Sequence, residues 1–174
     1  MNIQTNPWSF VPADVVTSTP AASPSGLIAS AGGIVALTTT GAHGLAANQF
    51  VTIVNPTLAG YKGFYKVLAV PSGTTATLYS PSLAVPGTTI LAASGGGTVV
   101  LVQYEDMVRA EDMYWLNANA AGDEIIVLQR NGNLVWDAIA PTGAPGNYSR
   151  SKPYWINGIA IQKLSSGTLT VTIN

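Results

Sequence analysis

The chain has 174 residues, of which 47% are hydrophobic and only 9% are charged, with a formal net charge of −1. The apolar content is enough to bury a core and excludes a disordered tail, which combines high charge with few apolar residues. Nucleic-acid binding needs clustered cations to neutralise phosphates. The seven lysines and arginines are scattered, so we expect no nucleic-acid partner.

The sequence offers no cysteine, which excludes disulfides and thiolate metal sites. No run approaches the roughly 18 apolar residues of a membrane span. The first residues lack the basic and apolar regions of a signal peptide. We therefore expect that the protein is synthesised in the cytoplasm and does not associate with a membrane. A weakly charged surface favours a protein that packs against copies of itself or a partner.

The segment 1–29 is rich in proline, serine and threonine. Proline lacks an amide donor and restricts the preceding residue to extended conformations. We therefore expect an extended N-terminal arm that lies outside the core. Within it, three side chains are too apolar for a solvated tail and are predicted to be anchors at a subunit interface, namely Trp8, Phe10 and Val11.

Residues 30–104 contain short runs of β-branched residues separated by glycine, proline and asparagine. This sequence pattern is typical of an antiparallel barrel or sandwich. We expect a small β-barrel module over 30–104, with strands at 34–38, 49–54, 63–70, 75–79 and 97–104.

The stretch 105–113 alone has a helical spacing of apolar residues, and it is too short to predict more than one turn or an irregular crossover. We place a module boundary near residue 104, at this acidic stretch. Beyond it, Asn131-Gly132 between two apolar runs predicts a hairpin, because both residues tolerate positive φ.

A second hairpin is predicted from 154–164 and 168–173, and the last strand alternates apolar residues with threonine as a half-buried strand does. We expect 105–174 to form an antiparallel β-sandwich module, separate from the preceding module or continuous with it. The predicted fold class is therefore all-β, with antiparallel barrel or sandwich regions behind an extended N-terminal arm.

Two stretches resemble known virion proteins. Residues 35–80, with His43-Gly44-Leu45, Gly63-Phe64-Tyr65-Lys66-Val67 and Thr75-Ala76-Thr77-Leu78, are similar to small β-barrel modules of tailed-phage particles. Residues 105–174, which end on a strand that follows Ser166-Gly167-Thr168-Leu169, resemble short β-sandwich proteins of phage particles. The resemblance implies a structural role in the virion.

Among such roles, the arm and the low charge favour a capsid decoration (cement) protein that binds between subunits of the phage major capsid protein. We expect a homo-oligomer, for which a trimer would be a natural symmetric form. One alternative is a tail, baseplate or head–tail adaptor component. Another is a carbohydrate-binding receptor module that uses exposed aromatic residues.

Catalytic chemistry is not indicated by the sequence. His43 is the sole histidine and lies in a glycine-flanked turn without a partner for acid–base catalysis. We interpret it as a turn residue whose ring caps backbone amides or packs over the end of the barrel. The acidic pairs on either side of Arg109 lack the spacing of an EF-hand, and a solvated acidic turn is favoured over a Ca²⁺ site. We predict no enzyme activity, no cofactor and no metal site.

The remaining aromatic residues divide between core and surface. Trp136 shares the strand phase of Leu134 and is predicted to be buried. Tyr154 and Trp155 are adjacent and must point to opposite faces of a strand, so only one can face the core. Trp155 joins the N-terminal residues as a candidate interface anchor.

Overall fold

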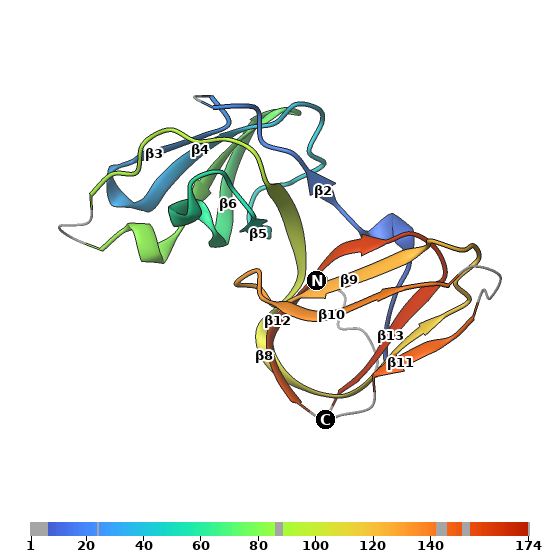
Figure 1. Cartoon of the computed structure of the whole chain (residues 1–174). Helices are drawn as coiled ribbons and strands as arrows, with labels where there is room; N and C mark the ends of the chain where they lie inside the picture. Colours follow the sequence, from blue (N-terminus) through green and yellow to red (C-terminus); the bar gives the residue numbers. More distant parts are fainter. Residues whose placement is uncertain (1–6, 24, 86–88, 142–145, 151–153, 174) are drawn as a thin grey trace.

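The computed structural model describes residues 7–23, 25–85, 89–141, 146–150 and 154–173. Within them, thirteen strands pair antiparallel in one continuous sheet, with the order β10-β9-β12-β8-β5-β6-β7-β4-β3 along its main path. Figure 1 shows two lobes that are joined by the long strand β8 (Thr98–Leu116). The prediction of an all-β antiparallel fold is confirmed, but the sheet stays open and does not close into a barrel or sandwich.

The first lobe, at the upper left of Figure 1, is built around the start of β8. Its core includes the fully buried side chains of Leu27, Tyr61, Tyr65 and Leu78. Its strands are β2 (Thr17–Ser18), β3 (Leu27–Ser30), β4 (Ile34–Thr38), β5 (Phe50–Val54), β6 (Gly63–Ser72) and β7 (Thr75–Tyr79). Short 3₁₀ turns cover Ala31–Gly33, Ala59–Tyr61 and Pro81–Leu83, and another, Pro12–Asp14, follows β1.

The second lobe, at the lower right, contains the rest of β8, which curves around it in Figure 1. Its core is a separate cluster that includes Met113, Trp115 and Trp136, so the predicted burial of Trp136 is confirmed. Its other strands are β1 (Trp8–Phe10), β9 (Glu124–Leu128), β10 (Leu134–Ile139), β11 (Tyr148–Arg150), β12 (Tyr154–Leu164) and β13 (Thr168–Ile173).

Strand β8 belongs to both lobes. Residues 98–101 pair with β5, residues 102–110 pair with β12, and residues 110–116 pair with β13. The expected module boundary near residue 104 therefore falls inside a strand, close to the point at which β8 passes from one lobe to the other.

The helical spacing over 105–113 proves misleading, because the whole stretch is strand. Val108 and Ala110 are buried and alternate with more exposed neighbours, as expected for a strand. A register shift opposite Thr172 and Ile173 then inserts one residue, so the next buried positions are Met113 and Trp115. Tyr104, Met107 and Val108, whose spacing suggested a helix, do not share one face, because Met107 is 62% exposed and Val108 is buried.

The N-terminal segment is not an arm outside the core, and that prediction is wrong for the described residues. β1 pairs with β13, β2 pairs with β8, and β3 pairs with β4. Trp8 and Phe10 lie on one face of β1 and are buried in the second lobe, where the rings of Trp8 and Tyr104 have centroids 4.5 Å apart. Extended proline-rich chain is compatible with such edge strands. Residues 1–6 and Pro24 lie outside the described residues.

The two lobes pack against each other through a third apolar cluster. It contains Val54, Val100, Val102, Leu128 and Ala160, which come from both lobes and from the shared strand. The turn between β9 and β10 points toward the first lobe in Figure 1. A Cβ added at Gly132 in this turn would lie 2.8 Å from Val54 Cγ1, so the contact is close. The lobes therefore form one packed body.

Candidate interaction surface

The four predicted interface anchors separate into two groups. Trp8 and Phe10 are 7% and 5% exposed and fill the core of their own chain, so they are not available to a partner and the prediction for them is wrong. Val11 and Trp155 are 43% and 65% exposed. The side chain of Tyr154, the neighbour of Trp155, lies outside what the structure describes.

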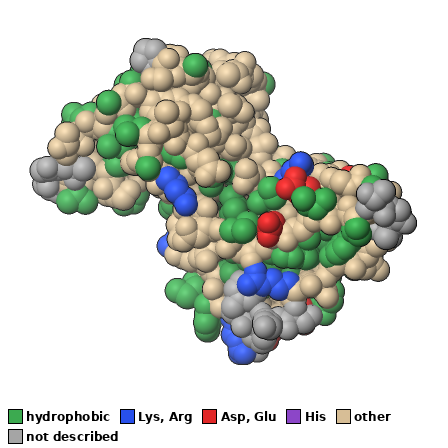
Figure 2. Space-filling model, viewed as in Figure 1, with side chains coloured by type: hydrophobic (Ala, Val, Ile, Leu, Met, Phe, Trp, Pro, Cys, Tyr) green, Lys and Arg blue, Asp and Glu red, His purple; other side chains and the backbone are tan. Residues whose placement is uncertain are grey.

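Large apolar side chains are exposed on both lobes, and Figure 2 shows hydrophobic groups on each of them. The first lobe exposes Ile28, Leu58, Leu68, Val85 and Ile90. The second lobe exposes Met107, Leu134, Ile139 and Trp155. Single exposed apolar residues are normal, whereas neighbouring ones indicate an interaction surface.

One such group lies on the outer face of β8 and β12. The register places Trp155 opposite Arg109 and Asn157 opposite Met107, so these four side chains share one face. Met107 is 62% exposed. Glu111 adds a carboxylate, with its Oε1 3.3 Å from Nε of Arg109. We call Met107, Arg109, Glu111, Trp155 and Asn157 the Met107–Trp155 surface.

The sequence named Trp155 as a candidate anchor and gave no such place to Met107, which the structure shows beside it on the same face. The missing information was the cross-strand register, which brings together residues that lie far apart in the sequence. The alternation of exposed Met107 and half-buried Arg109 with buried Val108 and Ala110 was the available signal, and it was obscured by the register shift that follows.

His43 is buried and both ring nitrogens contact the backbone. The Leu45 N–H donates to Nδ1 at 3.0 Å, and Nε2 lies 3.2 Å from the carbonyl oxygen of Thr75. This geometry fits a neutral ring with the proton on Nε2. Of the two interpretations of His43, the cap for backbone groups is confirmed.

The acidic residues of the expected turn lie on a strand, and a further one, Asp123, makes structural contacts. Glu105, Asp106, Glu111 and Asp112 lie on β8 and not in the expected turn. Asp123 Oδ2 accepts hydrogen bonds from the Ser166 hydroxyl and from the N–H groups of Ala120 and Asn119. These bonds, the Ser166 bond most of all, hold the pKa of Asp123 below its usual value. No group of three or more metal-ligating side chains occurs among the described residues.

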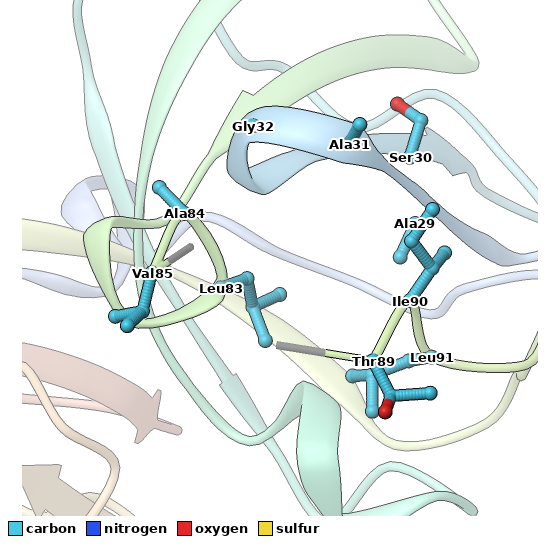
Figure 3. Close-up of a pocket in the computed structure, with 10 residues that line it drawn as sticks. All are labelled: Ala29, Ser30, Ala31, Gly32, Leu83, Ala84, Val85, Thr89, Ile90 and Leu91. Atoms are coloured by element: carbon cyan, nitrogen blue, oxygen red, sulfur yellow. The ribbon is translucent and has the colours of Figure 1, made fainter. Parts of the chain in front are cut away.

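A small cavity of about 270 Å³ lies at the edge of the first lobe (Figure 3). Residues 29–32, 83–85 and 89–91 line it, and they carry no ionisable side chain. The cavity is therefore lined by uncharged, mostly apolar residues and contains no acid–base group.

A wider groove of about 520 Å³ runs between the lobes, with Leu101 to Gln103 and Glu105 of β8 among its lining residues. Polar side chains that line this groove form hydrogen bonds with nearby backbone groups. The Gln103 amide donates to the Asp14 carbonyl at 3.0 Å and accepts from the Ile161 N–H at 2.9 Å. Asp14 Oδ2 accepts from the Val11 N–H at 2.8 Å. The Gln103 bonds fasten the segment after β1 to β8 and β12, and the Asp14 bond closes the turn within that segment.

Comparison with protein-family models, with curated proteins and with solved structures finds no match for this chain. Within the described residues, no helix has the length and apolar character needed to cross a membrane. Among the described residues, the exposed apolar surfaces are the features on which a proposal of function can be based.

Proposed function

We propose that the protein is a structural component of a tailed-phage particle and that it decorates the head by binding between subunits of the major capsid protein. The carrying observation is a single packed body with two lobes, each of which exposes large apolar side chains. One molecule can thereby contact two neighbouring subunits at once. The same role is the one that the resemblance of residues 35–80 and 105–174 to phage particle modules led us to expect from the sequence.

The connection between the lobes suits a protein that must resist separation of its partners. β8 runs through both lobes, so a pull on one is carried along a continuous hydrogen-bonded strand. The interlobe cluster around Val100 and Val102 adds buried contact beside it. A protein that bridges two subunits can hold them together only if its own lobes stay in contact. The continuous strand β8 and the interlobe cluster keep the lobes in contact.

The exposed side chains can supply the binding energy. Burying one large apolar side chain is worth about 2 kcal/mol, so two or three per lobe offer a useful share of a stable interface. With only 9% charged residues, the surface has few ions to desolvate on binding. Protein interfaces are depleted of charge at their centres for this reason.

Electron cryo-microscopy of purified particles tests the proposal. We expect density for both lobes over the head, with each lobe on a different capsid subunit. Density confined to the tail, baseplate or head–tail junction would contradict decoration and support the adaptor or tail alternative. Particles that lack the protein should also release their DNA at a lower temperature than complete particles.

The 65% exposure of Trp155 favours one second candidate, a carbohydrate-binding receptor module. Exposed tryptophan rings present an apolar face on which a sugar ring can stack. A glycan array with the intact protein tests it. Binding that disappears in Trp155→Ala would support this role, and an array without binding would remove it.

A further inference from the structure

We propose that the Met107–Trp155 surface binds the same surface of a second copy of this chain, which forms a two-fold symmetric pair. This inference goes beyond the proposed role on the phage head, because it concerns the free protein and holds wherever the protein acts. It names the partner, the contact residues and the symmetry of the contact.

The centre of the surface has the composition of an interface hot spot. Trp155 and Met107 are 65% and 62% exposed and lie diagonally across one antiparallel strand pair. Tryptophan, methionine and arginine are the residue types enriched at protein interfaces. Arg109 lies directly opposite Trp155 in the register, so all three types meet on one sheet face.

The charges of the surface are self-complementary. Arg109 and Glu111 carry opposite charges, lie 3.3 Å apart and have side chains that are 42% and 25% exposed. A two-fold rotation reverses their order, so Arg109 of one copy can approach Glu111 of the other while both remain neutralised. A surface with a single sign of charge would repel its own copy.

A comparison with the exposed residues of β10 favours the Met107–Trp155 surface as the site of self-association. Leu134 and Ile139 are 56% and 62% exposed, which is close to the exposure of Met107 and Trp155. The residue exposed between them is Asp137. The register also places Glu124 and Lys163 beside them on β9 and β12, where the two form an ion pair, so this face keeps one net negative charge. Two copies of this strand brought together would place like charges close to each other, which is unfavourable.

Sedimentation velocity of the full chain, over concentrations from about 1 μM to about 1 mM, tests the pairing. We expect a reversible monomer–dimer equilibrium that weakens on the order of tenfold or more in Trp155→Ala and in Met107→Ala. Ile139→Ala is the matched control, since it removes an equally exposed apolar side chain, and it should leave the equilibrium unchanged. Thermal unfolding shows whether each variant remains folded.

A charge exchange tests the symmetry. Arg109→Glu and Glu111→Arg should each weaken self-association, because each places like charges opposite one another in the pair. Mixing the two variants should restore association as a heterodimer, since one copy then carries two negative and the other two positive side chains.

Some results would overturn the inference. They are a wild-type chain that stays monomeric throughout the concentration range, a dimer unaffected by Trp155→Ala, and folded charge variants that fail to combine. A trimeric mass would contradict the two-fold contact. None of these results depends on whether the protein is found on phage heads, so the two proposals can fail separately.

Discussion

Arg130, in the turn between β9 and β10, lies over the ring of Phe64 on β6, with its guanidinium carbon 5.0 Å from the ring centroid. Its Nη1 also donates a 2.7 Å hydrogen bond to the Glu105 carbonyl of β8. One side chain of the second lobe thus contacts the first lobe and the shared strand.

Removing this side chain should loosen the join between the lobes. We expect Arg130→Ala to lower the free energy of unfolding by about 2 kcal/mol, from the lost cation–π contact and charged hydrogen bond. Urea unfolding measures the loss. Arg130→Lys, which keeps the charge and loses the planar group, should fall between the wild type and Arg130→Ala. Equal stability of all three proteins would show that the contact contributes nothing.

Gly132 tests the contact of the same turn with β5. It has a φ of +79°, and an added Cβ would lie 2.8 Å from Val54 Cγ1. Gly122 has a similar φ of +84°, with no atom within 4 Å of an added Cβ. Both Gly→Ala changes cost roughly 1 kcal/mol of backbone strain, and Gly132→Ala should cost about 1 kcal/mol more through the clash. Equal losses in chemical unfolding would argue against a close lobe contact.

Tyr61 connects two backbone segments of the first lobe through its hydroxyl. The hydroxyl accepts from the Ala29 N–H and donates to the Ala92 carbonyl, each at 3.0 Å. Tyr61→Phe leaves both groups without this partner and should lower the free energy of unfolding by about 2 kcal/mol or more. Tyr79→Phe serves as the control, because no hydrogen bond of that hydroxyl is found in the described part of the chain, and it should change stability little.

Asp123 should make stability depend on acidity. Its pKa is lowered in the folded protein, first by the Ser166 hydroxyl and then by the backbone donors. A lowered folded pKa means that the contribution is complete above the unfolded pKa, about 3.9, and is lost as the pH falls through the folded pKa. We expect Asp123→Asn to melt below the wild type at neutral pH, with the difference shrinking under acid conditions below about pH 4.

Melting temperatures between about pH 7 and about pH 2.5 give this comparison. Asp137→Asn, at an exposed position of β10, is the control for replacing a carboxylate by an amide. A difference for Asp123→Asn that stays constant with pH, or that Asp137→Asn reproduces, would contradict the role of the Asp123 carboxylate.

The strands that the sequence predicted well are those with regular local alternation. The strands 34–38, 75–79, 154–164 and 168–173 agree with β4, β7, β12 and β13. In β4, β7 and β13 the buried face repeats every second residue, so the pattern alone identifies the strand. β12 is buried without a break over residues 158–161, and its prediction came from its apolar run and the turn that precedes β13. The Asn131-Gly132 turn was predicted for a related reason, because Gly132 does adopt a positive φ.

The elements that were missed depend on distant partners. β1 has three residues and becomes a strand through its pairing with β13, and β2 has two residues that pair with β8. Such short segments carry no period of their own. Likewise, the neighbourhood of Met107 and Trp155 depends on the register between β8 and β12, which local sequence does not encode.

The pairing of β1 with β13 brings the first and last strands of the described residues together in one lobe. During synthesis the strands β3 to β7 and the start of β8 emerge in sequence and can assemble before the rest is made. The second lobe must wait for its last strand, which makes its folding slow and strongly non-local. A ribosome-bound chain stalled before β13 should therefore show hydrogen-exchange protection in the first lobe alone, and protection of β9 and β12 at that stage would refute this order of folding.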